Sequence, residues 1–187
     1  MTALERLDPA KADKLGVADF ERLYSVGAFA DLGRIELLDG EVVKLSAQAR
    51  PHLRLKTAIF LSLRDAVIEH FPALTVFPEG TVVLSEYDAP DPDVLVTDDA
   101  EGSGFVRGAS VPLVVEVSDT TLRADLGRKA ILYASAGIAE YWVADVNGRV
   151  HQMWSPSSEG YRERRTIVFG EPINSVELIG VSVVVTA

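Results

Sequence analysis

The sequence predicts a mixed α/β domain in which one β-sheet is flanked by helices. Residues 51–71 carry apolar side chains at helical spacing and predict the longest helix. Three apolar runs follow and predict strands, at residues 74–84, 93–96 and 113–117. A second helical pattern covers residues 122–135. This order predicts packed layers around one core, and 187 residues suffice for a single domain with a substantial core.

An additional hairpin is expected before this core. Residues 34–45 are typical of two strands around Asp39-Gly40, which is a strong signal for a two-residue turn. Residues 17–26 predict a short amphipathic helix. Residues 1–14 are polar, and we expect them to be loosely ordered.

Further strands are expected after the second helix. They cover residues 140–146, 149–154, 161–168 and 182–186. Asn147-Gly148 predicts a tight turn between the first two of them. Residues 98–110 are rich in glycine and predict an exposed loop within the core region. The central sheet is therefore expected to be extended by β-structure at both ends of the chain.

Composition restricts the classes of function. The chain has no cysteine, which excludes disulfides and thiolate zinc sites and fits a reducing cytoplasm. No signal-peptide pattern is present, and the apolar runs are too short to span a bilayer. We therefore expect a cytoplasmic location. The net charge of −10 argues against tight binding of nucleic acid, so any DNA contact is expected to be weak or transient.

Two carboxylates stand out because they lie in apolar strands. Asp93 begins one predicted strand, and Glu116 lies in the Val-Val-Glu-Val run of the next. Adjacent strands are about 4.8 Å apart, so both carboxylates could bind one Mg²⁺, which prefers one or two carboxylates together with water and phosphate oxygens. The alternative is structural: Asp93 caps a turn and Glu116 pairs with an arginine.

The following helix carries a lysine that fits this site. Asp125, Lys129 and Tyr133 recur every four residues and would share one helix face. Lys129 could then return towards Glu116 and stabilise charge on a phosphate under attack. An exposed Asp125–Lys129 ion pair is the alternative. Together the two acids and the lysine indicate a metal-dependent nuclease.

Other polar residues are weaker candidates. His52 opens the long helix and either contacts the site or is simply a polar residue at a helix start. Glu36 and Glu41 flank the hairpin turn, where acids are usually solvated. No phosphate-binding loop, dinucleotide fingerprint, zinc-protease motif or nucleophile elbow is present.

These motifs together resemble the Uma2 family, also called DUF820, whose fold is of the PD-(D/E)XK restriction-endonuclease type. The resemblance spans most of the chain. It covers the run from Ile35 to Glu41, His52, Pro92-Asp93-Val94, the Val114 to Ser118 run, Asp125-xxx-Lys129-xxx-Tyr133, and Gly137-Ile138-xx-Tyr141-Trp142-Val143.

The resemblance implies roles for individual residues. Asp93 and Glu116 would be the metal ligands, with Mg²⁺ as the cofactor and Mn²⁺ able to substitute. The motif's usual lysine position is Ser118 here, and in this family the lysine is thought to come from the next helix, where Lys129 is the matching residue. Glu41 and His52 would complete the rim of the pocket, and Asp125 would position Lys129.

Two functions are therefore expected as alternatives. The first is a Mg²⁺-dependent DNA endonuclease that uses Asp93, Glu116 and Lys129, supported by Glu41, His52, Asp125 and Tyr133. The second is a catalytically inactive protein of nuclease fold that acts through protein contacts as a homodimer. The negative charge, the displaced lysine and the apolar residues 176–185 favour the second. A homodimer is expected in either case.

Overall fold

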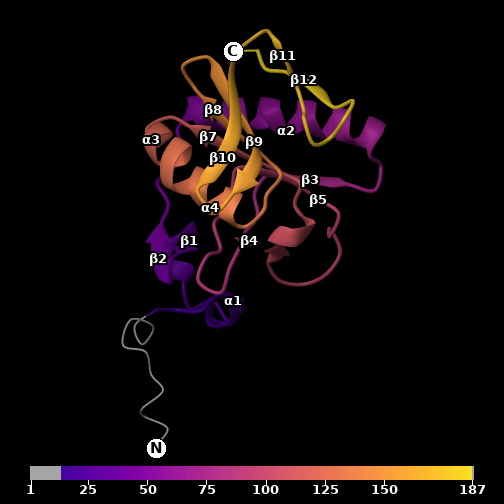
Figure 1. Ribbon diagram of the computed structural model, residues 1–187. Coiled ribbons are helices and arrows are strands. Elements are labelled where there is room, and N and C mark those ends of the chain that lie inside the picture. The colour runs from indigo at the N-terminus through magenta and orange to yellow at the C-terminus, as the bar shows by residue number, and fades with distance from the viewer. Residues whose placement is uncertain (1–13, 187) are drawn as a thin grey trace, which may run out of the picture.

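A six-stranded mixed sheet lies at the centre of the computed structural model, which describes residues 14–186 (Figure 1). The strand order is β10-β9-β8-β7-β5-β3. The central pair β7 and β8 is parallel, whereas the other neighbours are antiparallel. The strands are β3 (Thr75–Phe77), β5 (Val94–Thr97), β7 (Leu113–Ser118), β8 (Glu140–Asp145), β9 (Arg149–Ser157) and β10 (Gly160–Val168). The predicted mixed sheet between helices is confirmed.

Helices cover both faces of this sheet. On one face lies α2 (Arg50–His70), which has Pro51 in its first turn. On the other lie α3 (Leu122–Ala124), the π-helix η4 (Asp125–Lys129) and α4 (Ala130–Ser135). The alternate residues of β7 enter the two resulting cores. This double coverage explains why β7 is an almost uninterrupted apolar run.

The predicted single helix over residues 122–135 is wrong in one respect, because its middle is π-helical. Five residues from Asp125 to Lys129 form the π-helix between the two short α-helices. The wider turn changes the direction of the side chains that follow it, so the four-residue spacing of Asp125 and Lys129 does not describe one regular helix face. Single π-turns inside α-helices are frequent at functional sites.

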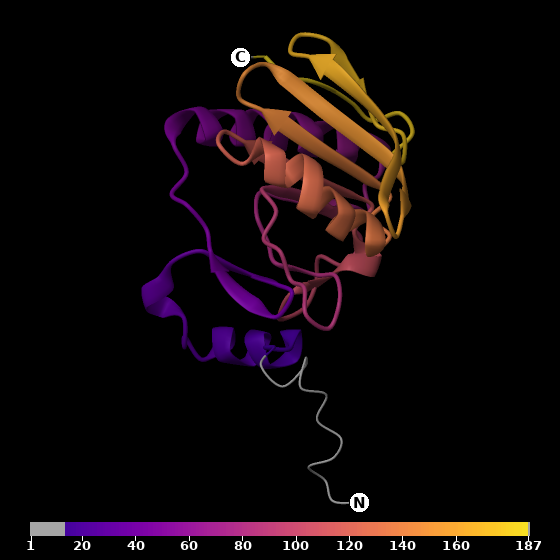
Figure 2. The ribbon, with the colours of Figure 1, turned by 60° about the vertical axis from the view of Figure 1, so that its left-hand side comes forward.

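The N-terminal elements form a separate layer below the sheet (Figure 2). They are α1 (Val17–Ser25), η2 (Ala30–Leu32), β1 (Ile35–Leu38) and β2 (Glu41–Lys44). Asp39 and Gly40 both have positive φ, at 54° and 75°, as the predicted two-residue hairpin turn requires. A Cβ at Gly40 would lie 2.7 Å from the Cβ of Lys14, so the packing also requires glycine there. Of the residues expected to be loosely ordered, only Lys14 is within the described part of the chain.

The chain from residue 74 to residue 84 does not form the one strand that the sequence predicts. It divides into β3 and β4 (Val82–Val83), which belong to different sheets. Pro78 has no N–H for a sheet hydrogen bond, and Glu79 has a φ of 150°. Strand β4 pairs with β6 (Val106–Arg107), followed by η3 (Gly108–Ser110), so the expected loop at 98–110 contains a short strand.

The hairpin is held by the segment that leads into β5. Leu37 and Ala89 exchange two backbone hydrogen bonds, of 3.1 and 2.8 Å. Both residues are fully buried in a small core with Phe20 of α1. The acid at position 36 is therefore fixed relative to the segment that carries Asp91 and Asp93.

The C-terminal segment returns to cover the core over α2. It forms β11 (Pro172–Asn174), which the sequence did not predict, and β12 (Ser182–Val184). Glu140 anchors it: one carboxylate oxygen accepts bonds from Ser175 Oγ at 2.6 Å and from the backbone N–H groups of Val176 and Glu177 at 2.9 Å. Five apolar side chains of the segment are buried in the core with α2, namely Ile173, Leu178, Val181, Val183 and Val185. These side chains are therefore not available to a partner, whereas Val176, Ile179 and Val184 of the same segment are exposed.

Candidate active site

A cavity of about 530 Å³ opens between the N-terminal hairpin and the ends of the central strands. Its walls come from β1 and β2, the linker to α2, the first turn of α2, the start of β5, the end of β7 and the helical segment after β7. The polar residues lining it include Arg34, Glu36, Lys44, Gln48, His52, Asp91, Asp93, Glu116, Asp125, Arg128 and Lys129. The cavity therefore collects side chains that are distant in sequence around the acidic ends of two paired strands.

Strand pairing brings Asp93 and Glu116 together. Val94 of β5 pairs with Val115 of β7, so the preceding Asp93 lies opposite Glu116. Both residues are buried, at 5% exposure each. Directly opposite residues have Cβ atoms about 4.5–5.5 Å apart on one face of a sheet, and the sequence prediction of two neighbouring carboxylates therefore agrees with this geometry.

Asp93 is surrounded by nitrogen donors. Its Oδ2 accepts the backbone N–H of Val117 at 2.9 Å and lies 3.1 Å from His52 Nε2. Its Oδ1 accepts from Gln48 Nε2 at 3.2 Å and lies 3.6 Å from Lys56 Nζ. Burial alone would raise the pKa of Asp93, but the hydrogen bonds from His52 and the Val117 N–H, together with the nearby charges of His52 and Lys56, outweigh it and lower the pKa. Asp93 is thus held as a carboxylate.

Glu116 shares a lysine with a second acid. Lys129 Nζ donates to Glu116 Oε1 at 3.0 Å and lies 3.2 Å from Glu36 Oε2. Burial raises the pKa of Glu116 to about 8, although the Lys129 ammonium opposes the shift. Burial would lower the pKa of Lys129, but Glu116 and Glu36 together raise it. Lys129 is therefore a permanent cation at the carboxyl end of β7.

Two buried tyrosines, Tyr133 and Tyr141, donate hydrogen bonds to this part of the site. Tyr133 donates to Glu116 Oε1 at 2.8 Å, and burial keeps its pKa far above the ordinary value, so it acts only as a hydroxyl donor. Tyr141 donates to the backbone carbonyl of Asp125, at 3.1 Å, inside the π-helix. The two rings pack with their centroids 4.9 Å apart. Both hydroxyl groups thus act on the elements that carry Glu116 and Lys129.

Asp125 lines the cavity but does not contact Lys129 directly. Its Oδ2 accepts from the Thr121 hydroxyl. Burial raises the pKa of Asp125, while Thr121 and the Lys129 charge oppose the shift. No direct bond joins Asp125 to Lys129 among the contacts of the described residues. If Asp125 positions Lys129, it would do so through the attraction between their charges and through the π-helix backbone that they share.

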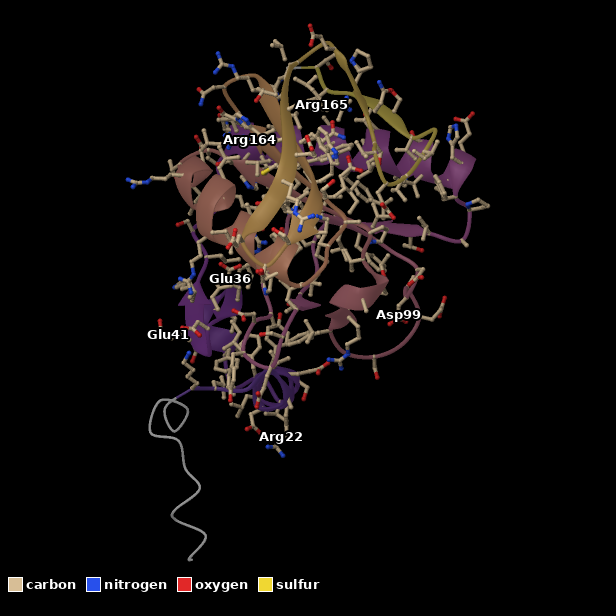
Figure 3. All side chains as sticks on the ribbon, viewed as in Figure 1. Arg22, Glu36, Glu41, Asp99, Arg164 and Arg165 are labelled. Carbon is tan, nitrogen blue, oxygen red and sulfur yellow. The ribbon has the colours of Figure 1, made fainter. Side chains whose placement is uncertain are left out.

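The structure brings together most residues that the sequence singles out. Asp93, Glu116, Lys129, His52 and Asp125 line the cavity, and Tyr133 lies beneath it. Glu41 is different: it is exposed on β2, does not line the cavity, and lies on the outer part of the hairpin in Figure 3. The roles of all these residues stay predictions.

The sequence did not assign Arg34, Lys56 and Glu79 to this region, and it offered Glu36 only as a weaker candidate. Glu36 is 3% exposed and faces Lys129, although acids beside a hairpin turn are usually solvated. Lys56 is buried beside Asp93. Glu79 forms ion pairs with both Lys56 and Arg34. The four-residue interval from His52 to Lys56 would have placed Lys56 on the His52 face of α2, whereas Glu79 depends on a loop that no local pattern predicts.

The residues present suit a magnesium ion with few protein ligands. Within residues 14–186, no group of three or more His, Asp or Glu side chains forms a ready-made metal cage. Magnesium is usually bound by one or two carboxylates, with waters and substrate phosphates completing its coordination. Two buried carboxylates side by side at an open cavity meet that requirement. Calcium, which needs six or more oxygen ligands, would fit less well.

Together, the mixed sheet and the paired acids at the ends of β5 and β7 define an α/β protein of restriction-endonuclease-like architecture. A solved structure has this fold: "a putative nuclease belonging to DUF820 from Anabaena variabilis ATCC 29413" matches with a TM-score of 0.53 and 15% identity. The match covers 74% of this chain and 77% of that one. At this identity, the likeness shows the fold.

The chain belongs to the Uma2 family, whose model, described as "Putative restriction endonuclease", matches residues 17–186. The resemblance inferred from the sequence motifs is thereby confirmed. No curated protein matches the chain. Among the helices of residues 14–186, none is long and apolar enough to cross a membrane.

Proposed function

We propose that this protein is a Mg²⁺-dependent endonuclease that hydrolyses phosphodiester bonds in DNA. The observation that carries the proposal is the contact of Lys129 with Glu116 at 3.0 Å, beside Asp93 on the neighbouring strand. The carboxyl groups of Asp93 and Glu116 and the Lys129 ammonium then converge from the residue before β5, from β7 and from the π-helix. The family description and the name of the structural neighbour support a nuclease.

Each residue has a defined task in this proposal. Asp93 and Glu116 would hold Mg²⁺, with Mn²⁺ able to replace it. The bound ion would supply positive charge for the phosphate and acidify a water molecule. Lys129 would stabilise the charge that develops on the phosphate oxygens. Tyr133 donates a hydrogen bond to Glu116, and His52 contacts Asp93 Oδ2 at 3.1 Å.

The proposed substrate agrees with the distribution of charge around the cavity. The chain has a net charge of −10, which disfavours broad contact with DNA. The cavity nevertheless has cations on its walls, including Arg34, Lys44 and Arg128 beside Lys129. The Arg164–Arg165 pair lies on β10, away from Glu36 in Figure 3, and does not line the cavity. We therefore propose a local and transient DNA contact.

Cleavage of supercoiled plasmid in the presence of Mn²⁺ tests the proposal. Wild-type protein should cleave, and Glu116→Ala and Lys129→Ala should each reduce the rate at least ~100-fold, because each removes a charged group from the reacting centre. Glu69→Ala is a matched control, since Glu69 is an exposed acid on the last turn of α2. Circular dichroism should verify that each variant is folded.

The outcomes are distinct. Retained cleavage in Glu116→Ala would show that the carboxylate is not a metal ligand. Retained cleavage in Lys129→Ala alone would leave the metal site in place and remove the proposed role of the lysine. No cleavage by the wild type on plasmid or single-stranded DNA would contradict the nuclease itself.

The alternative function is a catalytically inactive interaction module that forms a homodimer. One observation favours it: the outer face of α2 exposes Leu53, Leu61 and Ile68, at 45%, 42% and 56%. A second hollow of about 650 Å³ adjoins the first two of these residues. This alternative predicts a folded protein without cleavage and without a stabilising effect of Mn²⁺.

A further inference from the structure

Three nitrogen donors converge on a single carboxylate at the edge of the candidate site. The acceptor is Glu79 Oε1. Gln48 Nε2 donates to it at 3.2 Å, Arg34 Nη2 lies 3.3 Å from it, and Lys56 Nζ forms an ion pair with it. The donors come from the residue before β1, from the linker and from α2, so the tertiary fold has built a small anion-binding cluster.

Lys56 is more deeply buried than the acid that it binds, and Arg34 has a second ionic partner. The Lys56 side chain is only 9% exposed, whereas that of Glu79 is 41% exposed. A buried ammonium needs an anionic partner because its desolvation is costly. Arg34 is fixed independently, by Asp91 at 2.8 Å. Glu79 is therefore the outer and exchangeable member of the cluster.

The backbone of Glu79 is unusual as well. Its φ of 150° is sparsely populated by residues with a side chain. It lies between β3 and β4, where the predicted strand is interrupted. Strained conformations are unfavourable and persist where surrounding contacts determine them. The bonds to the carboxylate are such contacts, so Glu79 is free to relax once another anion takes them over.

The local charges allow such an exchange in the metal-free protein, and a filled metal site would favour it further. Arg34 and Lys56 face three acids, namely Asp91, Asp93 and Glu79. The acids thus outnumber the cations by one, so removal of Glu79 takes away both a negative charge and the competing carboxylate, even without a metal ion. A divalent ion held by Asp93 would add further positive charge and would strengthen the attraction for an anion.

We propose that Arg34, Gln48 and Lys56 form a subsite for a phosphate group of the substrate, and that the Glu79 carboxylate occupies this subsite when substrate is absent. The assignment of the phosphate to nucleic acid rests on the proposed nuclease function. Arginine and lysine are the residues that most often bind phosphate. The subsite adjoins the reacting centre, because Gln48 and Arg34 line the same cavity and Gln48 also bonds Asp93 at 3.2 Å.

Binding of inorganic phosphate by the metal-free protein tests this subsite directly. Glu79→Ala should bind phosphate roughly 10-fold more tightly than the wild type, because the internal competitor is gone. Glu69→Ala also removes one exposed acid and should bind as the wild type does. Adding Gln48→Ala or Lys56→Met to Glu79→Ala should abolish the gain. Gln48→Ala keeps the test valid if Lys56→Met does not fold.

Equal phosphate affinity in Glu79→Ala and Glu69→Ala would overturn the subsite. A gain that survives both second substitutions would overturn it too, because the phosphate would then bind elsewhere. The measurement needs neither cleavage nor a metal ion. A phosphate gain in a protein that never cleaves DNA would contradict only the nuclease, and cleavage without that gain would contradict only the subsite.

Discussion

At the scale of single residues, Glu116 shows most directly how the fold creates chemistry. It is the one acid in the Val-Val-Glu-Val run, and the side chains of both neighbours, Val115 and Val117, enter the apolar core on the α2 side of the sheet. An isolated buried carboxylate would be strongly destabilising. Lys129 and Tyr133 both donate to the same oxygen, Oε1. The bonding capacity of the carboxylate towards the cavity therefore remains available for a metal ion.

Tyr133→Phe should lower the free energy of unfolding by about 1–2 kcal/mol, because Glu116 loses a donor while the ring packing is kept. Urea denaturation of the metal-free protein measures the change. Tyr24→Phe is the matched control, because the Tyr24 ring is half exposed on α1 and its hydroxyl group has no part in the site. Equal stability of the two variants would show that the Tyr133 hydroxyl contributes nothing to holding Glu116.

The sequence predicts the residues whose position follows from strand register. Asp93 and Glu116 lie side by side because β5 and β7 pair with the register that their apolar patterns favour. Arg34, Lys56 and Glu79 could not be assigned in this way. Their meeting depends on how the N-terminal hairpin packs and on the loop after β3, which are tertiary features without a local period.

At the scale of elements, the π-helix determines where Lys129 lies. A π-turn inserts one residue into the helix and redirects the residues after it. The Tyr141 hydroxyl donates to the carbonyl of Asp125 within this segment, at 3.1 Å. Tyr141 is fully buried on β8, so its hydroxyl group links the sheet to the π-helix. We infer that this contact stabilises the wide turn.

Tyr141→Phe should therefore loosen the π-helix without unfolding the protein. Amide hydrogen exchange at residues 125–130 should accelerate about 10-fold, which corresponds to the loss of one hydrogen bond of ordinary strength. Tyr161→Phe provides the comparison, because its hydroxyl bonds the carbonyl of Ile138 at 2.9 Å, outside the π-helix. If both variants leave exchange at residues 125–130 unchanged, Tyr141 does not stabilise the segment.

Element types were more predictable than their interruptions. The long helix α2 and the β1–β2 hairpin follow from periodicity, from Pro51 and from Asp39-Gly40. The break between β3 and β4 and the π-turn were missed. Pro78 is a local signal for the break, whereas the π-turn depends on a contact made by a distant element. Both missed features lie beside the cavity. Such local departures from regular structure are expected at functional sites.

At the scale of the whole molecule, the apolar cores and the cavity lined by charged side chains occupy different regions. Two apolar cores on opposite faces of the sheet stabilise the frame. The N-terminal layer forms one wall of the cavity, to which it contributes Arg34 and Glu36. The net charge of −10 includes acids that line this cavity. A bound divalent ion would reduce their mutual repulsion, so metal binding and global stability should be linked.

A thermal melt with and without Mn²⁺ measures this link. Because a ligand that binds only the native state raises the melting temperature, Mn²⁺ at ten times its Kd should stabilise the protein by about 1.4 kcal/mol, or roughly 3–5 °C for a domain of this size. Asp93→Asn should abolish the shift, since it removes one of the two proposed ligands. Glu41→Gln should retain it, because Glu41 is exposed and outside the cavity.

A wild-type protein that does not respond to Mn²⁺ or Mg²⁺ would contradict the metal site and favour the interaction module. Loss of the shift in both variants would instead return Glu41 to the site, which would require the β1–β2 hairpin to close over the cavity when the ion binds.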